Sequence, residues 1–252
     1  MRRLQGRGGE TVKKKRIWII PLAVAVLLFA LFLGYTGQYY RADETAERAL
    51  NSDVAVTVER TDYGWFFDGP SETDALVFYP GAKVEETAYA PLLHRLAERG
   101  MDVCLVRMPF RLAVFGQNRG LDVMKLYQYD CWYIGGHSLG GAMASGYASK
   151  HGDQLNGVIL LGAYAMDELD EDLTTVLIYG SEDNVLNMEN YEKSRSYLPN
   201  SAVEHIIPGG NHAQFGSYGK QKGDGEASIS PENQIEETVS VILAAVKETE
   251  NP

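Results

Sequence analysis

Apolar and polar positions divide the chain of 252 residues into an apolar N-terminal segment and a longer region of short apolar runs. Residues 17–35 read IWIIPLAVAVLLFALFLGY and contain no charged side chain, and their length is about what a helix needs to cross the hydrocarbon core of a membrane. Residues 36–52 are mostly polar. The pattern therefore predicts a transmembrane signal anchor over 17–35, a stalk over 36–52 and a folded domain over 53–252.

The domain shows two spacings of apolar residues, one typical of strands and one typical of helices. Residues 54–60 and 64–67 flank a short turn and favour an antiparallel strand pair. Apolar runs without alternation, as in strands buried on both faces, lie at 75–81, 101–109, 132–136, 157–164, 174–180 and 203–209. Segments of helical character lie at 89–100, 121–128, 139–152, 188–197 and 231–248. This alternation predicts an α/β fold with a mostly parallel central sheet flanked by helices, in which ligands bind beyond the carboxyl ends of the strands.

Charge is unevenly distributed along the chain. Because residues 1–16 contribute +6 to the net charge of −11, the rest of the chain carries −17. A domain this acidic repels nucleic acid, which excludes that class of partner. By the positive-inside rule, the basic segment over 1–16 is cytoplasmic and the domain beyond the anchor is extracellular. A cleaved signal peptide is the alternative to an anchor, although the apolar segment is long and no clean cleavage site follows it.

The motif Gly136-His137-Ser138-Leu139-Gly140 follows a predicted strand and opens a predicted helix. This is the context of a nucleophile elbow, where the chain reverses so sharply that the residues two before and two after the serine must lack bulk. Gly136 and Gly140 meet that need. The Ser138 hydroxyl is expected to project above the sheet, where the helix N-terminus favours developing negative charge. Ser138 is therefore the candidate nucleophile.

Proteins with this elbow carry the orienting acid and the histidine base downstream of the serine, in that order. The predicted strand TTVLIYG runs into an acidic turn, in which Asp183 is the candidate acid and Glu182 the alternative. The predicted strand VEHIIPG runs into a glycine-rich loop that ends in His212. A histidine on such a loop can reach the nucleophile, so His212 is the candidate base. His137 is expected to point away from Ser138.

Acyl transfer also needs backbone N–H groups that hold the oxyanion of the tetrahedral intermediate. One donor is the residue after the nucleophile, here Leu139, and the other comes from the loop after the strand at 75–81. We expect the Ala82 amide to be this second donor, with the Lys83 amide as the alternative.

Metal and redox chemistry have little support in the sequence. The two cysteines, Cys104 and Cys131, lie in or beside apolar runs and are typical of small buried side chains. The sequence contains neither C-x-x-C nor a Cys/His spacing of a metal site. We therefore expect no metal and no organic cofactor, and the sequence leaves open whether the cysteines pair.

Four segments of the chain resemble the α/β-hydrolase fold-5 family of bacteria. They are FYPGAKVEETAYAPLLHRLAERG, GGHSLGGAMASGYASKHG, LIYGSEDNV and GGNHAQFGSYGKQKGDGEASIS, and the similarity spans roughly residues 72–245. The resemblance implies the α/β-hydrolase fold and a hydrolase triad at Ser138, Asp183 and His212. It implies no particular substrate.

Only a short connection separates the predicted strands at 157–164 and 174–180, which leaves no room for a large cap domain. We therefore expect an active site that is open or covered by loops, with Phe110, Phe115 and Phe215 binding the acyl part of the substrate. The hypothesis is an esterase-like serine hydrolase that cleaves a carboxylic ester, of a small molecule or a lipid, through an acyl-enzyme. The alternatives are hydrolysis of a lipid, thioester or amide bond, and a catalytically silent fold used for binding.

Overall fold

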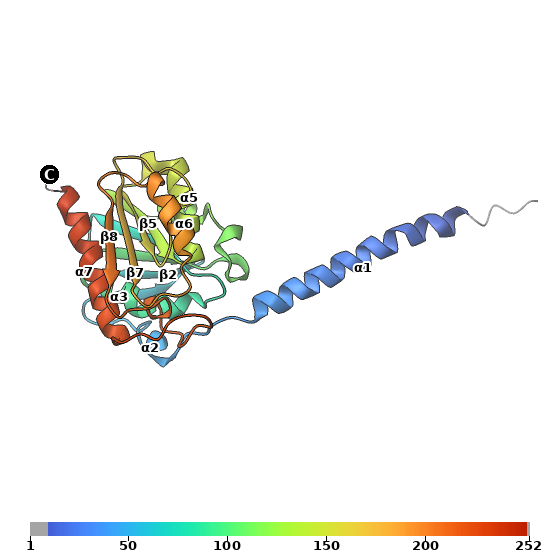
Figure 1. The fold of residues 1–252 in the computed structure, drawn as a ribbon, viewed down its shortest axis with the longest axis horizontal. Coiled ribbons are helices and arrows are strands. Elements are labelled where there is room, and N and C mark those ends of the chain that lie inside the picture. Colours follow the sequence, from blue (N-terminus) through green and yellow to red (C-terminus); the bar gives the residue numbers. More distant parts are fainter. Residues whose placement is uncertain (1–9, 251–252) are drawn as a thin grey trace, which may run out of the picture. The chain divides into compact units, whose positions relative to one another are not determined.

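The structure is a computed structural model that describes residues 10–250, with side chains over residues 20–247. These residues form two units, an N-terminal helix and a compact domain that begins at Tyr39 (Figure 1). All the candidate site residues lie in the compact domain.

The N-terminal unit is helix α1, which spans Glu10–Gly37. Within it, Ile20–Gly37 is long and apolar enough to cross a membrane, by length and composition. The anchor expected over 17–35 lies inside this helix. Part of the basic segment expected over 1–16, namely residues 1–9, lies outside the described residues.

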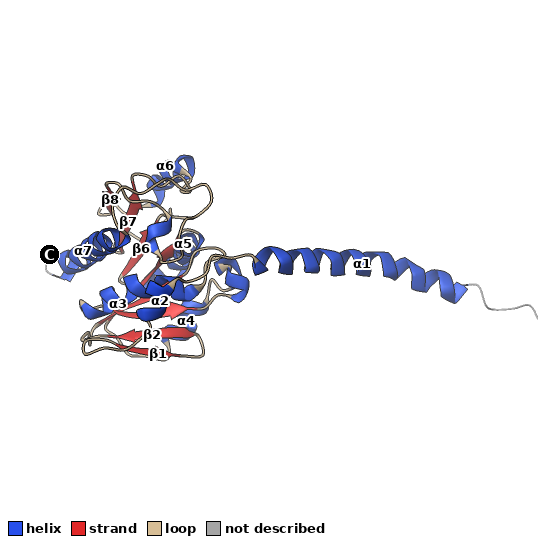
Figure 2. Ribbon diagram, turned by 90° about the horizontal axis from the view of Figure 1, so that it is seen from below, coloured by secondary structure: helices blue, strands red, loops and turns tan. Residues whose placement is uncertain are grey.

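In the described part of the chain, an eight-stranded sheet forms the centre of the compact domain (Figure 2). Its strands are β1 Thr57–Arg60, β2 Gly64–Asp68, β3 Asp74–Tyr79, β4 Asp102–Val106, β5 Cys131–His137, β6 Gly157–Leu161, β7 Thr174–Gly180 and β8 Val203–Ile207. Their order is β1-β2-β4-β3-β5-β6-β7-β8, with β2 antiparallel to β1 and β4 and all other pairs parallel. The expected antiparallel pair and the expected parallel sheet are both confirmed.

Helices cover both faces of the sheet (Figures 1 and 2). One face carries α3 (Ala90–Glu98) and α7 (Pro231–Glu250), and the other carries α4 (Arg119–Met124), α5 (Leu139–His151) and α6 (Met188–Ser194). Successive side chains of β3 divide between the two cores: Leu76 and Phe78 enter the first, and Val77 and Tyr79 enter the second. All four are fully buried, which explains why the strands read as continuous apolar runs.

Short 3₁₀ helices lie in the connections, at Glu86–Tyr89, Pro109–Arg111, Ala113–Phe115, Gly152–Gln154, Arg195–Tyr197 and Ala213–Phe215. The helix expected at 121–128 is displaced, since α4 ends at Met124. Beyond it, the Tyr127 ring stacks on Phe66 with a centroid separation of 4.6 Å. The packing of Tyr127 against β2 thus takes the place of the last helical turn that the spacing predicted.

The segment expected to be a stalk over 36–52 is instead largely folded onto the domain. Its Asp43 N–H donates to the Ser217 carbonyl (2.9 Å). The Asp43 carboxylate caps the short helix α2 (Glu44–Arg48), in which Ala46 is fully buried. Hydrogen bonds and one small side chain hold the segment, and a polar composition gives no sign of such contacts.

Candidate active site

Ser138 lies between β5 and α5 in a backbone conformation that non-glycine residues rarely adopt, with φ 53° and ψ −124°. The turn is as crowded as the motif predicts. A Cβ atom on Gly136 would lie 2.4 Å from the Tyr79 carbonyl oxygen, and one on Gly140 would lie 2.1 Å from the same atom. The Ser138 N–H donates to the Leu161 carbonyl of β6 (2.9 Å), which fixes the elbow to the neighbouring strand.

Asp183 and His212, 29 residues apart in the chain, form a buried pair. The His212 Nδ1 atom lies 2.7 Å from Asp183 Oδ2, and the side chains are 1% and 0% exposed. The other carboxylate oxygen, Oδ1, accepts from the N–H groups of Val185 (2.9 Å) and Leu186 (2.8 Å). Because the carboxylate accepts the Nδ1 proton, Nε2 is the nitrogen left to take a proton. This Nε2 is buried and has no hydrogen-bond partner among the described residues.

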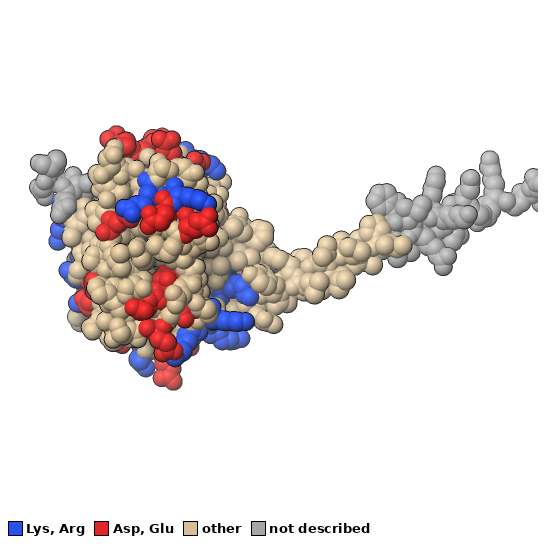
Figure 3. Space-filling model, in the orientation of Figure 1, with Lys and Arg blue, Asp and Glu red and all other residues tan. Residues whose placement is uncertain are grey.

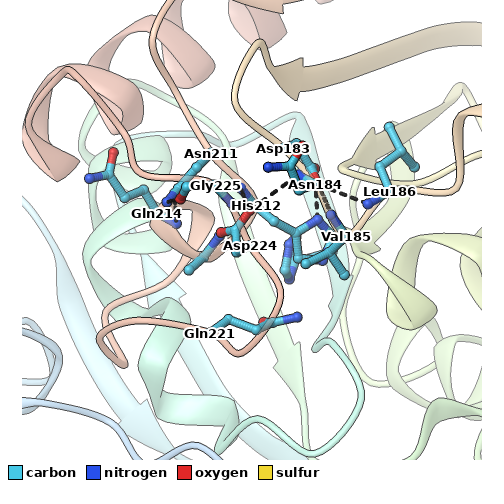
Figure 4. A network of polar contacts seen from close by, with 12 residues as sticks. Asp183, Asn184, Val185, Leu186, Asn211, His212, Gln214, Gln221, Asp224 and Gly225 are labelled. Carbon is cyan, nitrogen blue, oxygen red and sulfur yellow. Dashed lines mark hydrogen bonds and ion pairs between the residues drawn. The ribbon is translucent and has the colours of Figure 1, made fainter.

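The side chains of Gln234 and Asp224 hold the loop that carries His212, and Figure 4 shows Asp224 beside it. The Asn211 N–H donates to Gln234 Oε1 (3.0 Å), and Gln234 Nε2 donates back to the Asn211 carbonyl (2.8 Å). Asp224 accepts from the N–H groups of Ala213 (2.8 Å) and His212 (3.3 Å). His212 therefore lies on a backbone segment whose polar groups are bonded on both sides, which restricts its movement.

Ser138 and His212 both line one surface cavity of about 290 Å³. The rest of its wall is mostly apolar, with Leu139, Ala142, Met143, Gly162, Ala163, Tyr164, Met166, Val185, Leu186 and Asn187. The structure thus brings together the three residues that the sequence proposed as a triad, since Asp183 is bonded to the histidine of this cavity.

The three phenylalanines expected to bind the acyl group do not line this cavity. Phe215 is 1% exposed and packs against His137, with ring centroids 5.5 Å apart. Phe110 and Phe115 are 44% and 53% exposed and contact each other edge to face. Phe110 and Phe115 thus lie exposed in the loop after β4, outside the lining of this cavity.

The two expected oxyanion donors lie directly after Ser138 and in the loop after β3. Leu139 begins α5, where the first N–H groups of a helix have no partner within the helix. Ala82 follows β3, and its N–H makes no hydrogen bond among the described residues. The alternative donor, the Lys83 N–H, is already bonded to the Arg111 carbonyl (2.9 Å). This occupied amide favours Ala82 over Lys83.

His137 does not point away from the site, as the sequence suggested, but packs beneath the base. Its ring centroid lies 4.3 Å from that of His212. The His137 Nδ1 atom is 2.8 Å from the Tyr89 hydroxyl, which also accepts from the Gly81 N–H (3.0 Å). Burial and the nearby His212 hold the pKa of His137 well below its usual value, so the ring is neutral. A buried chain of hydrogen bonds therefore joins the loop of Ala82 to the strand of the nucleophile.

Sequence reasoning missed three residues that support this arrangement: Tyr89, Asp224 and Gln234. Asp224 left a signal, because an acid between two glycines stands in the segment GDG that follows the base. Tyr89 and Gln234 left none, since both lie in or beside helical segments where buried side chains are ordinary.

Among the described residues, no group of three His, Cys, Asp or Glu side chains is placed to hold a metal ion. Cys104 is buried in β4 and Cys131 is partly exposed at the start of β5, and no disulfide joins these two described residues. Burial raises the pKa of the Cys104 thiol to about 12, so it is not a nucleophile at neutral pH.

Comparison with solved structures gives the same fold. The chain is similar to a membrane phospholipase A described as a bacterial virulence factor, with 14% identity, a TM-score of 0.58 and coverage of 96% of this chain and 100% of that one. It is also similar to TT1662 from Thermus thermophilus (13%, 0.56, 77% and 99%) and to a soluble variant of monoglyceride lipase from Saccharomyces cerevisiae (11%, 0.52, 78% and 96%). At these identities the likeness shows the fold alone.

No curated protein matches the chain. The sequence profile of the alpha/beta hydrolase family matches residues 75–236, which is more than half of the chain and includes all three candidate triad residues. The elbow, the buried acid–histidine pair and the strand order agree with that match. The chain therefore belongs to the alpha/beta hydrolase family.

Proposed function

We propose that this hydrolase is a serine esterase that works through an acyl-enzyme. The observation that carries the proposal is the buried Asp183–His212 bond of 2.7 Å, which leaves Nε2 without a hydrogen-bond partner among the described residues, in a histidine that lines the same cavity as Ser138. A carboxylate that orients a histidine beside a serine is the arrangement that activates a hydroxyl for attack on a carbonyl.

In the proposed reaction, His212 Nε2 takes the Ser138 proton as the serine oxygen bonds to the ester carbonyl carbon. The Leu139 and Ala82 N–H groups hold the resulting oxyanion. When the intermediate collapses, the carbon–oxygen bond to the alcohol breaks, and His212 returns the proton to that alcohol. Water then attacks the acyl-enzyme with His212 as base, which releases the acid and restores Ser138.

The mostly apolar wall of the cavity favours an ester with an apolar acyl group over a charged substrate. A phospholipase and a monoglyceride lipase among the similar structures are lipid hydrolases by name, which agrees with an ester substrate but does not distinguish lipids from small esters. We further propose that α1 anchors the protein in a membrane with the basic N-terminus in the cytoplasm and the domain outside the cell.

The test is labelling of the full-length protein, in detergent, with a fluorophosphonate probe, together with hydrolysis of p-nitrophenyl esters of increasing chain length. We expect the wild type to be labelled and active, and the Ser138→Ala variant to be neither. Ser149→Ala, which changes a partly buried serine of the same helix, is the matched control and should resemble the wild type. Labelling that persists in Ser138→Ala would remove Ser138 from the role of nucleophile, and a folded, unlabelled wild type would favour a silent binding protein.

A further inference from the structure

The loop after β4 exposes large apolar side chains that the site does not use. Phe110, Val114 and Phe115 are 44%, 48% and 53% exposed, and they lie in two consecutive 3₁₀ turns. Exposed apolar residues that gather in one short segment mark surfaces that meet another apolar phase. We call these three residues the apolar loop.

The apolar loop is tied to the residue that follows the apolar helix. Helix α1 ends at Gly37, and Tyr39 is two residues further along the chain, a reach of about 7 Å. The guanidinium of Arg111 lies 3.5 Å from the centroid of the Tyr39 ring, and Arg41 lies 5.1 Å from the same centroid. If α1 spans a membrane, Tyr39 lies within that reach of the end of the helix, and Arg111 of the apolar loop's segment contacts Tyr39.

The charges around the apolar loop suit a lipid headgroup region better than the rest of the domain does. Arg107, Arg111 and Arg119 share a groove with two carboxylates, Glu85 and Glu86, a local charge of +1 in a region of the chain that carries −17. None of the three arginines forms an ion pair with a described carboxylate. Acidic and basic side chains both lie on the face of the domain drawn in Figure 3. Arginine and aromatic side chains together are typical of the membrane interface.

The same loop is bonded to the proposed oxyanion loop. The Arg111 carbonyl accepts the Lys83 N–H (2.9 Å), and Lys83 directly follows Ala82. Lys83, Phe110 and Arg111 all have φ between 54° and 58°, a region that costs a non-glycine residue about 1–2 kcal/mol. A force on the apolar loop therefore acts on backbone that is already strained and that adjoins a proposed catalytic amide.

We propose that the apolar loop inserts into the surface of the bilayer that α1 spans, and that the enzyme takes its ester substrate from that lipid surface. The proposal rests on the proposed esterase function and on the membrane anchor. Apolar contact supplies most of the binding, because the local charge is only +1.

The first test measures insertion without any use of activity. Full-length protein is placed in nanodiscs of phosphatidylcholine and phosphatidylglycerol, with a nitroxide label at Val114→Cys or, as control, at Tyr197→Cys, both in a Cys131→Ser background. Tyr197 is also exposed (40%), but it precedes β8. It therefore lies near the amino ends of the parallel strands, whereas the loop after β4 lies at their carboxyl ends. We expect oxygen to relax the label at 114 strongly and a water-soluble nickel chelate to relax it weakly, with the reverse at 197.

Equal access of both reagents at 114 and 197 would overturn the proposal. Low access of both reagents at 114 would overturn it as well, because a second copy or another protein would then cover the loop.

The second test compares rates on a long-chain ester carried in vesicles and on a short ester dissolved in water. We expect Val114→Asp to lower the ratio of the two rates by about tenfold, the factor that about 1.4 kcal/mol of lost apolar contact gives, while Tyr197→Asp leaves the ratio as in the wild type. If Val114→Asp lowered the rates on both esters equally, the loop would serve only the folding of the domain, and the proposal would be overturned. Failure of the esterase function is seen separately, as a wild type that hydrolyses neither ester.

Discussion

The two sides of the candidate site differ in how firmly they are held. On the acid–base side, both oxygens of Asp183 are bonded, the pair with His212 is almost fully buried, and Gln234 grips the adjacent backbone. On the oxyanion side, Lys83 and Arg111 have left-handed φ values, and the loop beyond them exposes aromatic rings. The proposed acid and base are thus held by buried side chains, whereas the proposed oxyanion loop is held by backbone hydrogen bonds in a strained conformation.

The largest effect should come from the acid. We expect Asp183→Asn to lower kcat by about 10⁴-fold, because an amide cannot fix the His212 ring in the form that takes the serine proton. Glu182→Gln, beside it on the surface, is the matched control and should change kcat by less than about twofold. Ester hydrolysis under single-turnover conditions measures both, and a large loss in Glu182→Gln with little loss in Asp183→Asn would transfer the role to Glu182.

A substitution at Gly162 tests how tightly the Asp183–His212 pair is packed. It has φ 51°, and an added Cβ would lie 2.9 Å from His212 Nδ1 and 3.2 Å from Asp183 Oδ2. We expect Gly162→Ala to lower kcat by about 10²-fold through displacement of that pair. Gly100→Ala also meets a positive φ (95°) but open space, so it should cost about 1 kcal/mol of stability and no activity. A Gly162→Ala variant with normal kcat would show that the pair can move freely.

His137 joins the two sides, and its removal should have an intermediate effect. His137→Phe keeps a ring against His212 but loses the bond to the Tyr89 hydroxyl, so we expect kcat to fall about tenfold with little change in KM. Tyr89→Phe removes the same bond and also the bond from the Gly81 N–H, so its loss of kcat should be at least as large. A fall in only one of the two variants would contradict the hydrogen-bonded link.

The His137→Phe variant also tests how the stability of the folded protein depends on pH. Because the pKa of His137 is below 6.5 in the folded protein, the unfolded chain binds the extra proton as the pH falls below 6.5. The contribution of His137 to the free energy of unfolding is therefore complete above pH 6.5 and is lost below it, by at most about 1.4 kcal/mol per pH unit. Urea unfolding at several pH values should show the wild type losing this stability relative to His137→Phe.

The smallest effect on activity is expected at Arg111, on the side of the proposed oxyanion loop. Arg111→Lys loses the flat stacking on Tyr39, worth about 1 kcal/mol, and should lower the rate on a dissolved ester by about twofold. Urea unfolding and steady-state rates measure the two quantities. A loss near that of Gly162→Ala would show that the oxyanion side is as firmly fixed as the acid–base side.

The sequence predicted the parts of the site that local chain geometry defines. The glycines around Ser138 report a crowded turn, and Asp183 and His212 each follow a strand of the parallel sheet, so the sheet brings them to one end. The strand order itself confirmed this expectation. Periodicity and turn chemistry are local properties, which is why they could be read without coordinates.

What the sequence could not supply depends on contacts between distant segments. Nothing in the pattern shows that Phe110 would turn outward or that the Tyr89 hydroxyl would meet His137, because side-chain direction in loops follows from packing. The folding of Asp43 onto the domain was hidden for the same reason. The positions of these side chains depend on contacts between segments that are far apart in the sequence.

The grip of Gln234 on Asn211 has a consequence for biosynthesis. Gln234 belongs to α7, which follows the eight strands of the described sheet in the chain and leaves the ribosome after them. Until that helix docks, the loop that carries His212 has no support from this side. The order of synthesis thus delays the final positioning of His212 until α7 has been made.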